Sequence, residues 1–254
     1  MQNLKIKLVQ ADLVWENHLA NLQHLTTLVG KPVKGEVVIL PEMFSSGFSM
    51  RPEIIAESMD GPSVQWMVAQ SRNRVICGSL SIKENDRFYN RFIWCEKGEV
   101  KYIYNKRHLF SYSGENQFYT AGDEKVFISY LGWKIAPFIC YDLRFPVWCR
   151  NTEKADLMLF VANWPERRIQ AWDTLLPARA VENQCYVAGV NRVGKDGNQL
   201  WHCGHSSVYD FTGNRHCLLE KEEQVYETEL DYEVLDEFRS RFPFLSDADE
   251  FNLM

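Results

Sequence analysis

The amino-acid sequence predicts a layered α/β domain with mixed β-sheets. Short apolar runs typical of strands alternate with segments of helical periodicity along the chain. Hairpin turns separate some of these runs and helices separate others, which favours both antiparallel and parallel pairing. The 254 residues contain no linker, low-complexity segment or internal repeat, and they are enough for a sizeable core. We therefore expect a single domain over residues 1–254.

The first part of the chain predicts two strands and two helices. Residues 4–10 alternate apolar and charged side chains, as a strand with one buried face does. Leucines at roughly helical spacing follow, and Gly30 ends that helix. Residues 36–40 are a short apolar run, consistent with a strand buried on both faces. The turn sequence at 60–63 then opens a second helix.

The central part predicts strands joined by tight turns. These strands are expected at residues 75–82, 88–95, 99–105, 125–130 and 133–140. Asp86 and Gly98 mark the first two turns, and Leu131-Gly132 is a two-residue hairpin signal. Neighbouring strands of this region should therefore pair antiparallel.

The last part of the chain begins with a buried run at 157–163 and a helix at 168–184. Pro177 lies inside that helix and should kink it or cause a local break, because proline lacks the N–H that the helix needs. Three more strands and a final helix complete the prediction, at residues 185–193, 206–210, 225–230 and 232–241.

Composition excludes several classes of function. The net charge is −6 and no basic block occurs, which argues against a nucleic-acid or membrane-surface partner. No apolar run of about 18 residues could span a membrane, and the N-terminus lacks the apolar core of a signal peptide. The seven cysteines are odd in number and contain no Cys-x-x-Cys pair, so we expect free thiols and a cytoplasmic protein.

Three ionisable side chains follow predicted strands directly. Glu42 follows the run at 36–40, Lys106 follows the strand at 99–105, and Cys140 ends the run at 133–140. Each alone has an ordinary explanation, since a glutamate or lysine in a turn is usually solvated and a cysteine is usually core filler. Sites in open α/β sheets gather at strand ends, and a carboxylate, an ammonium and a thiol together supply every role in acyl transfer.

The chemistry expected of this set is cysteine-based hydrolysis. A free thiol has a pKa of about 8.5, and a nearby Lys106 ammonium would favour the thiolate. A partly desolvated Glu42 could move the proton as base and then as acid. Lys106 and the N–H of Tyr141, which follows the nucleophile, would hold the oxyanion. Water activated by Glu42 would then cleave the thioester.

Two further side chains are candidates for substrate binding. Arg144 could bind a substrate carboxylate in a bidentate manner, or it could pair with Asp142 and brace the loop. Trp164 could wall the pocket, although a core position is the commoner role of tryptophan.

Two alternative interpretations of the sequence give Glu42 and Lys106 no role in the chemistry. A Cys–His hydrolase would use His108 or His205 as its base. A non-enzymatic zinc-binding protein would use His202, Cys203 and His205, but this spacing is too tight for a closed four-ligand site. No phosphate-binding glycine pattern supports a nucleotide fold.

Four segments together resemble the nitrilase, or carbon–nitrogen hydrolase, superfamily: ILPEMFSSGF, YNKRHLF, ICYDLRFP and VANWP. The family's catalytic motifs fall on Glu42, Lys106 and Cys140, at spacings of 64 and 34 residues (106 − 42 and 140 − 106). The resemblance implies that Glu115, in GENQFYTAGD, helps to hold the lysine. The segments at 179–194 and 203–210 also fit, so the resemblance covers nearly the whole chain.

Within the superfamily, CYDLRFP, NWP and the ending FPFLSDADEF are most similar to the bacterial omega-amidase branch. That resemblance implies hydrolysis of the side-chain amide of 2-oxoglutaramate or 2-oxosuccinamate to the 2-oxo diacid and ammonia. It also implies a four-layer α-β-β-α sandwich, no metal or organic cofactor, and a homodimer. Pro177 departs from the family's pattern. An N-carbamoyl amino-acid hydrolase or a nitrilase on the same fold stays open.

Overall fold

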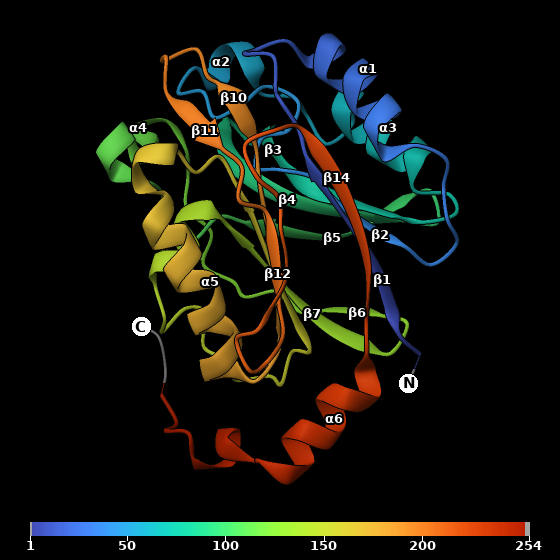
Figure 1. The fold of residues 1–254 in the computed structure, drawn as a ribbon. Helices are drawn as coiled ribbons and strands as arrows, with labels where there is room; N and C mark the ends of the chain where they lie inside the picture. Colours follow the sequence, from blue (N-terminus) through green and yellow to red (C-terminus); the bar gives the residue numbers. More distant parts are fainter. Residues whose placement is uncertain (1, 252–254) are drawn as a thin grey trace.

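The computed structural model describes residues 2–251 and shows two six-stranded mixed sheets packed face to face (Figure 1). The first sheet has the order β14 (Gln224–Leu230), β1 (Leu4–Gln10), β2 (Val37–Ile39), β3 (Val75–Glu84), β4 (Arg87–Glu96), β5 (Glu99–Asn105). The second has the order β13 (Arg215–Leu218), β12 (Ser207–Tyr209), β9 (Tyr186–Asn191), β8 (Leu157–Ala162), β7 (Trp133–Ile139), β6 (Ile128–Tyr130). In each sheet the three parallel strands, β1-β2-β3 and β7-β8-β9, are flanked by antiparallel ones.

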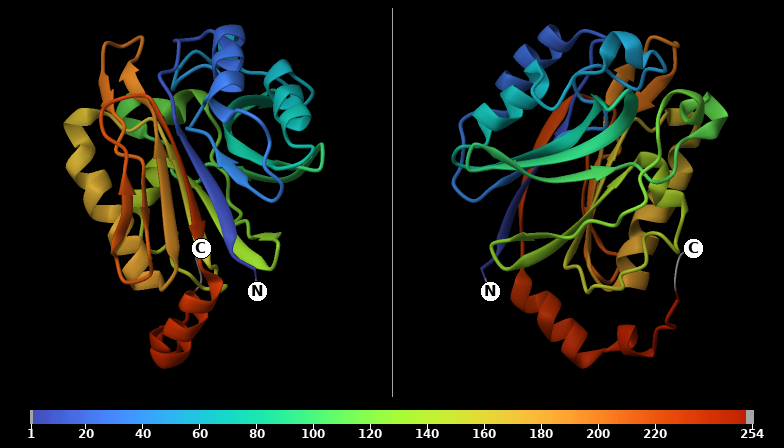
Figure 2. Two further views of the ribbon diagram at one scale, coloured as in Figure 1. Left: turned by 45° about the vertical axis from the view of Figure 1, so that its right-hand side comes forward. Right: turned by 180° about the vertical axis from the view of Figure 1, so that it is seen from behind.

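Helices cover the outer face of each sheet (Figure 2). α1 (His18–Val29) and α3 (Pro62–Gln70) lie on the first sheet, and α5 (Ile169–Asn183) lies on the second, against β9 and β12. The predicted four-layer α-β-β-α sandwich is therefore confirmed. The small hairpin of β10 (Val193–Lys195) and β11 (Trp201–Cys203) stands apart from both sheets.

Strand β2 shows how the layers are made from the sequence. Val37 and Ile39 point into the core between the sheets, whereas Val38 points into the second core, beneath α1 and α3. All three side chains are fully buried. The expectation of a strand buried on both faces is confirmed, because successive side chains in a strand face opposite sides.

Local signals set most element ends. The side chain of Asn17 accepts a hydrogen bond from the N–H of Ala20 at the start of α1, and Gly30 ends that helix with φ of 62°. Leu131 and Gly132 both have positive φ, 51° and 90°, as the tight hairpin between β6 and β7 requires. β6 is shorter than the predicted 125–130, since its pairing begins at Ile128.

Helix α5 runs without a break through Pro177, so the expected local break is wrong. Trp172 and Leu176 of this helix are fully buried, and both lie so close to Gly189 of β9 that a side chain there would collide with them. This close packing holds the helix on the sheet despite the poor helix propensity of proline.

The remaining helices are short or terminal. α2 (Pro52–Ile55) and α4 (Glu115–Phe118) are single turns, and α6 (Tyr232–Arg241) lies beyond the end of the sheets (Figure 1). The described part of the chain also has four 3₁₀ turns, at Ser111–Ser113, Cys140–Arg144, Glu166–Arg168 and Phe244–Asp247. None of the helices within residues 2–251 has the length and apolar character needed to span a bilayer.

Candidate active site

The three strand-end side chains predicted from the sequence meet between the two sheets. Glu42 follows β2 and Lys106 follows β5 in the first sheet, and Cys140 follows β7 in the second. Lys106 Nζ lies 2.8 Å from Glu42 Oε1, and the Cys140 thiol lies near enough for the charges of both residues to act on its pKa. Glu42 and Lys106 have exposed fractions of 0% and 1%, while Cys140 is half-buried. Cys140 and Lys106 line a cavity, whereas Glu42 lies behind them.

The Glu42 carboxylate is held at both oxygens. Oε1 accepts hydrogen bonds from Lys106 Nζ and from Asn90 Nδ2, each at 2.8 Å. Oε2 accepts a hydrogen bond of 2.8 Å from the backbone N–H of Asn163. A base fixed in this way needs little reorganisation when it receives a proton.

Glu115 supports Lys106 as the resemblance implied. Its carboxylate oxygens lie 3.1 and 3.0 Å from Lys106 Nζ, and one of them also accepts the N–H of Phe110. Burial alone would lower the pKa of Lys106, but the charges of Glu115 and Glu42 outweigh it and raise that pKa. Lys106 thus stays an ammonium at neutral pH. The pKa of Glu115 is raised, mainly by burial.

Cys140 starts a 3₁₀ turn with φ of 44°, a left-handed conformation that is rare for a residue with a side chain. Burial raises the pKa of its thiol well above the ordinary range, and the negative charge of Glu42 raises that pKa further. Lys106 acts in the opposite direction, as expected, but its effect is smaller. Lys106 therefore favours the thiolate as expected, but burial and Glu42 together raise the pKa of the thiol by more than Lys106 lowers it.

Asn90 is a member of the site that sequence reasoning missed. This fully buried amide donates to Glu42 Oε1 at 2.8 Å and to Glu115 Oε1 at 3.2 Å. Its oxygen accepts a 2.8 Å hydrogen bond from the hydroxyl of Ser79, which fixes the orientation of the amide. The signal was present in β4, because Asn90 shares a strand face with the core residues Phe92 and Trp94.

Asn163 is the second missed residue. It follows β8 and contacts Glu42 twice, through its backbone N–H to Oε2 and through its side-chain amide to the Glu42 carbonyl oxygen. Because β8 and β2 belong to different sheets, Asn163 ties the carboxylate of one sheet to the strand end of the other.

A cavity of about 570 Å³ opens onto Cys140. Its lining includes every substrate-binding residue that the sequence suggested, namely Tyr141, Arg144 and Trp164. The Arg144 guanidinium lies over the Trp164 ring, 4.9 Å from its centre. Asp142 instead accepts hydrogen bonds from Tyr104 Oη and from His108, so it is not the partner of Arg144. Trp164 is both buried and part of the cavity wall.

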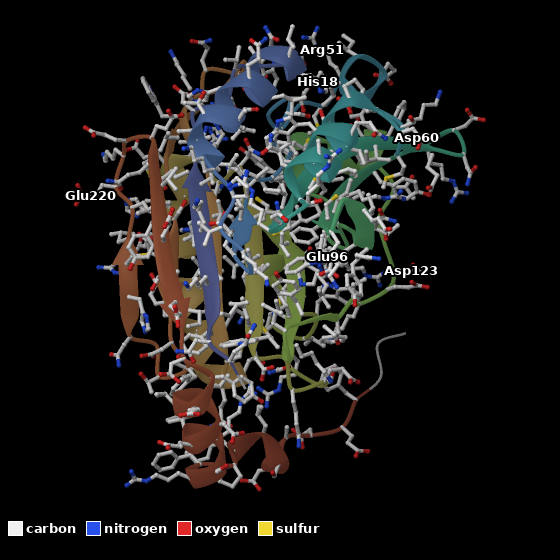
Figure 3. All side chains as sticks on the ribbon, turned by 90° about the vertical axis from the view of Figure 1, so that its right-hand side faces the viewer. His18, Arg51, Asp60, Glu96, Asp123 and Glu220 are labelled. Carbon is white, nitrogen blue, oxygen red and sulfur yellow. The ribbon has the colours of Figure 1, made fainter. Side chains whose placement is uncertain are left out.

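The lining of the cavity is cationic although the chain as a whole is acidic. Its charged side chains are one acid, Asp196, and five bases. Arg51 pairs with Glu16 and Lys106 with Glu42 and Glu115, whereas Arg144, Arg167 and Arg168 form no ion pair among residues 2–251. Many carboxylates lie instead on the outside of the molecule, as Asp60, Asp123 and Glu220 do in Figure 3. This distribution suits a small anionic ligand.

The alternative sites are not assembled. His108 Nδ1 hydrogen-bonds Asp142 and His205 Nδ1 hydrogen-bonds Asp173, each at 2.9 Å, and neither histidine lines the cavity. His202 lines it, but within residues 2–251 no three His, Cys, Asp or Glu side chains group as metal ligands would. A Cys–His pair and a zinc site formed by His202, Cys203 and His205 therefore lack support.

Comparisons with known proteins agree with this geometry. A family model described as carbon–nitrogen hydrolase matches residues 5–240. Omega-amidase YafV of Escherichia coli strain K12 is 43% identical over 256 residues, covering 100% of both chains. The 2-oxoglutaramate amidase of Bacillus subtilis is 30% identical over 95% of this chain and 96% of its own. A CN-hydrolase superfamily protein of Xanthomonas campestris, solved with an arsenic adduct in its active site, superposes with a TM-score of 0.96 at 44% identity over 100% of both chains.

Proposed function

The chain belongs to the carbon–nitrogen hydrolase family, and we propose that it is an omega-amidase. Its substrates would be small 2-oxo acid monoamides, 2-oxoglutaramate and 2-oxosuccinamate, and its products the 2-oxo diacid and ammonia. The names of two relatives support this substrate class. The observation that carries the proposal is the Lys106–Glu42 ion pair close to Cys140, with Lys106 and Cys140 both lining an arginine-rich cavity.

We assign the first half-reaction to the thiol of Cys140. Glu42 takes the thiol proton while the sulfur attacks the amide carbon, and the carbonyl oxygen becomes an oxyanion. Lys106 and the N–H of Tyr141 stabilise that oxygen. The C–N bond then breaks, Glu42 returns its proton to the leaving nitrogen, and ammonia departs from a thioester on Cys140.

The second half-reaction repeats these roles with water. Glu42 removes a proton from water, whose oxygen attacks the thioester carbon. The second oxyanion collapses, the C–S bond breaks, and the sulfur recovers the proton from Glu42. Glu115 and Asn90 hold Lys106 and Glu42 in place throughout, through the contacts described above. Each atom and proton is accounted for by side chains and water, without a metal or organic cofactor.

We assign substrate binding to Arg144, with Tyr141 and Trp164 as walls. Arg144 is stacked on Trp164, and no ion pair of Arg144 occurs within residues 2–251. Its N–H groups are therefore open to a planar carboxylate, which arginine binds with two parallel hydrogen bonds.

Ammonia release from a substrate panel tests the function. The panel holds 2-oxoglutaramate, 2-oxosuccinamate, simple amides, N-carbamoyl amino acids and nitriles. We expect the two oxo-acid amides to give the highest kcat/KM, and Cys140→Ser to lower kcat by about 10³-fold or more. Preference for a carbamoyl amino acid, which also releases CO2, or for a nitrile would replace the substrate assignment. Full activity of Cys140→Ser would remove the mechanism.

We also propose that the enzyme is a cytoplasmic homodimer. All seven cysteines are free, which suits a reducing compartment. The dimer rests on the family resemblance alone. Light scattering of the purified protein should give about twice the chain mass of 29.7 kDa, and a value of one chain mass would reject the dimer.

A further inference from the structure

Arg168 is a second guanidinium in the cavity wall, held by contacts of its own backbone. It ends the 3₁₀ turn Glu166–Arg168 that follows β8. Its carbonyl oxygen accepts a 2.8 Å hydrogen bond from Trp164 Nε1, and its N–H donates to Pro165 at 3.0 Å. Its side chain lies over the ring of Phe110, 4.8 Å from the centre. Because the Trp164 ring also carries Arg144, one tryptophan connects the two guanidinium groups.

Arg168, like Arg144, has no carboxylate partner among residues 2–251, whereas several other enclosed arginines do. Arg74 binds Glu36, Arg91 binds Glu84, and Arg239 binds Asp156. Arg168 forms no ion pair among residues 2–251, and the nearest acid in its own turn, Glu166, pairs with Lys221. A partly buried cation without a partner is unfavourable unless a ligand supplies the anion.

The electrostatic surroundings of Arg168 agree with an anion site. Burial lowers the pKa of this guanidinium, and the positive charges of Arg167 and Arg144 lower it further. Stacking on Phe110 covers one face of the guanidinium plane and leaves its N–H edge for hydrogen bonds. Two such edges, from Arg144 and Arg168, offer more donors than a single carboxylate needs.

The support of Arg168 is connected to the catalytic lysine. The ring of Phe110 carries Arg168, and the backbone N–H of Phe110 binds the carboxylate of Glu115. That carboxylate holds Lys106 Nζ. Phe110 also contacts the ring of Tyr141, next to Cys140, with 4.9 Å between ring centres. A ligand bound by Arg168 would thus lie beside the nucleophile Cys140 and beside the oxyanion donors Lys106 and Tyr141.

We propose that Arg168 is a specificity-determining residue that binds the 2-oxo acid end of the substrate together with Arg144. The carboxylate and the neighbouring ketone oxygen of a 2-oxo acid present three acceptors in one plane, which two guanidinium edges can share. The amide at the other end then reaches Cys140. This inference rests on the proposed function and adds a residue to it: amides with an anionic head are selected over neutral amides by Arg168.

The test compares Arg168→Gln with Arg215→Gln on two substrates. Arg215 is exposed on β13 and outside the cavity lining, so its variant removes the same charge without touching the site. The substrates are 2-oxoglutaramate and pentanamide, a neutral amide of equal chain length. For Arg168→Gln we expect kcat/KM on 2-oxoglutaramate to fall about 10–100-fold, mainly through KM, and on pentanamide by less than about twofold. Arg215→Gln should match wild type on both.

Binding of the reaction product, 2-oxoglutarate, gives a readout that does not depend on turnover. The inhibition constant of 2-oxoglutarate should rise about 10-fold or more in Arg168→Gln and recover in part in Arg168→Lys. Equal losses on both amides, or an unchanged inhibition constant, would show that Arg168 only braces the Phe110 loop and would overturn the inference. If the wild-type enzyme hydrolyses other amides but not 2-oxoglutaramate, the proposed function itself is wrong.

Discussion

At the scale of single residues, the neighbour of the Cys140 thiol decides its protonation state. The thiol lies near the Glu42 carboxylate and near Lys106, whose ammonium donates a hydrogen bond to that carboxylate. Burial and the charge of Glu42 raise the pKa of Cys140 more than Lys106 lowers it. The resting enzyme should therefore carry a thiol, unlike cysteine hydrolases whose thiolate is formed by a charged histidine.

The rate of alkylation of Cys140 by iodoacetamide, measured at a series of pH values, tests whether the pKa of this thiol is raised. In wild type the rate should rise only above about pH 8.5, the pKa of an ordinary thiol. Glu42→Gln removes a charge that raises the pKa of Cys140, so the rise should move to lower pH. Lys106→Met should move it to higher pH. Mass spectrometry of the Cys140 peptide distinguishes alkylation of Cys140 from that of the other cysteines. If the alkylation rate of wild type rises well below pH 8, burial and Glu42 do not outweigh Lys106 in setting the pKa of Cys140.

A second residue-scale prediction concerns the amide that joins the two carboxylates. Asn90→Asp keeps the shape of the side chain but replaces two N–H donors with a third carboxyl group beside Glu42 and Glu115. Crowded carboxyl groups without donors bind protons more readily. We expect kcat/KM to fall about 10²-fold and the acid limb of its pH profile to move to higher pH.

The matched control is Asn21→Asp. Asn21 is also fully buried, but its amide binds only the backbone of Val14 and Ser45. This variant should lower the melting temperature and leave the acid limb in place. If the two variants change stability alike and neither moves the pH profile, Asn90 has only a structural role.

Sequence reasoning found the three ionisable residues at the strand ends and missed the two asparagines that contact Glu42, for a physical reason. Glu42, Lys106 and Cys140 follow apolar strands, where ionisable groups are conspicuous. Asn90 and Asn163 act through contacts with residues 48 and 121 positions away (90 − 42 and 163 − 42), which no local pattern records. The direction of the pKa shift of Cys140 likewise depends on burial, which the sequence shows only indirectly.

At the scale of elements, the period-two and helical patterns located most strands and helices. The predicted bounds of β1 and α6 agree with the structure at both ends. The single-turn helices α2 and α4 and the short strand β11 were not predicted, because three or four residues cannot show a period. Their conformation depends on tertiary contacts, such as the hydrogen bonds from Lys106 and Phe110 to Glu115 in α4.

Helix α5 gives a prediction at this scale. Pro177 costs the helix a hydrogen bond and crowds the carbonyl of Asp173, yet packing keeps the helix whole. Pro177→Ala should therefore raise the free energy of unfolding by about 1–3 kcal/mol, or the melting temperature by a few degrees. Thermal unfolding followed by circular dichroism measures the change.

Pro62→Ala is the control for Pro177→Ala. Pro62 occupies the first turn of α3, where proline needs no hydrogen bond and its fixed φ suits the helix. Its replacement should not stabilise the protein. A Pro177→Ala variant that melts no higher than Pro62→Ala would mean that the α5 backbone has already relaxed around the proline.

At the scale of the whole molecule, local patterns predicted layers but not their arrangement. β14 pairs with β1 although they lie at opposite ends of the chain (Figure 1). No periodicity encodes this pairing, and the four-layer sandwich was expected only from the family resemblance. The meeting of the two sheets brings together Glu42 and Cys140, which follow strands of different sheets.

The acid sensitivity of the fold gives the last prediction. His202 lines the cavity and is 4% exposed, facing Arg192 and Asp196. Burial, followed by the charge of Arg192, lowers the pKa of His202 to about 4 from an ordinary 6.5. The unfolded chain therefore binds a proton at this residue between about pH 6.5 and pH 4 while the folded chain does not, so stability falls as the pH falls through this window.

Urea unfolding at pH 7 and pH 4.5 measures the effect in wild type and in His202→Gln. Wild type should lose about 2–3 kcal/mol more than the variant between these two pH values. His24→Gln is the control, because the ring of His24 lies at the surface beside Glu223, and this variant should lose as much stability as wild type. Parallel losses in all three proteins would mean that His202 is protonated in the folded state.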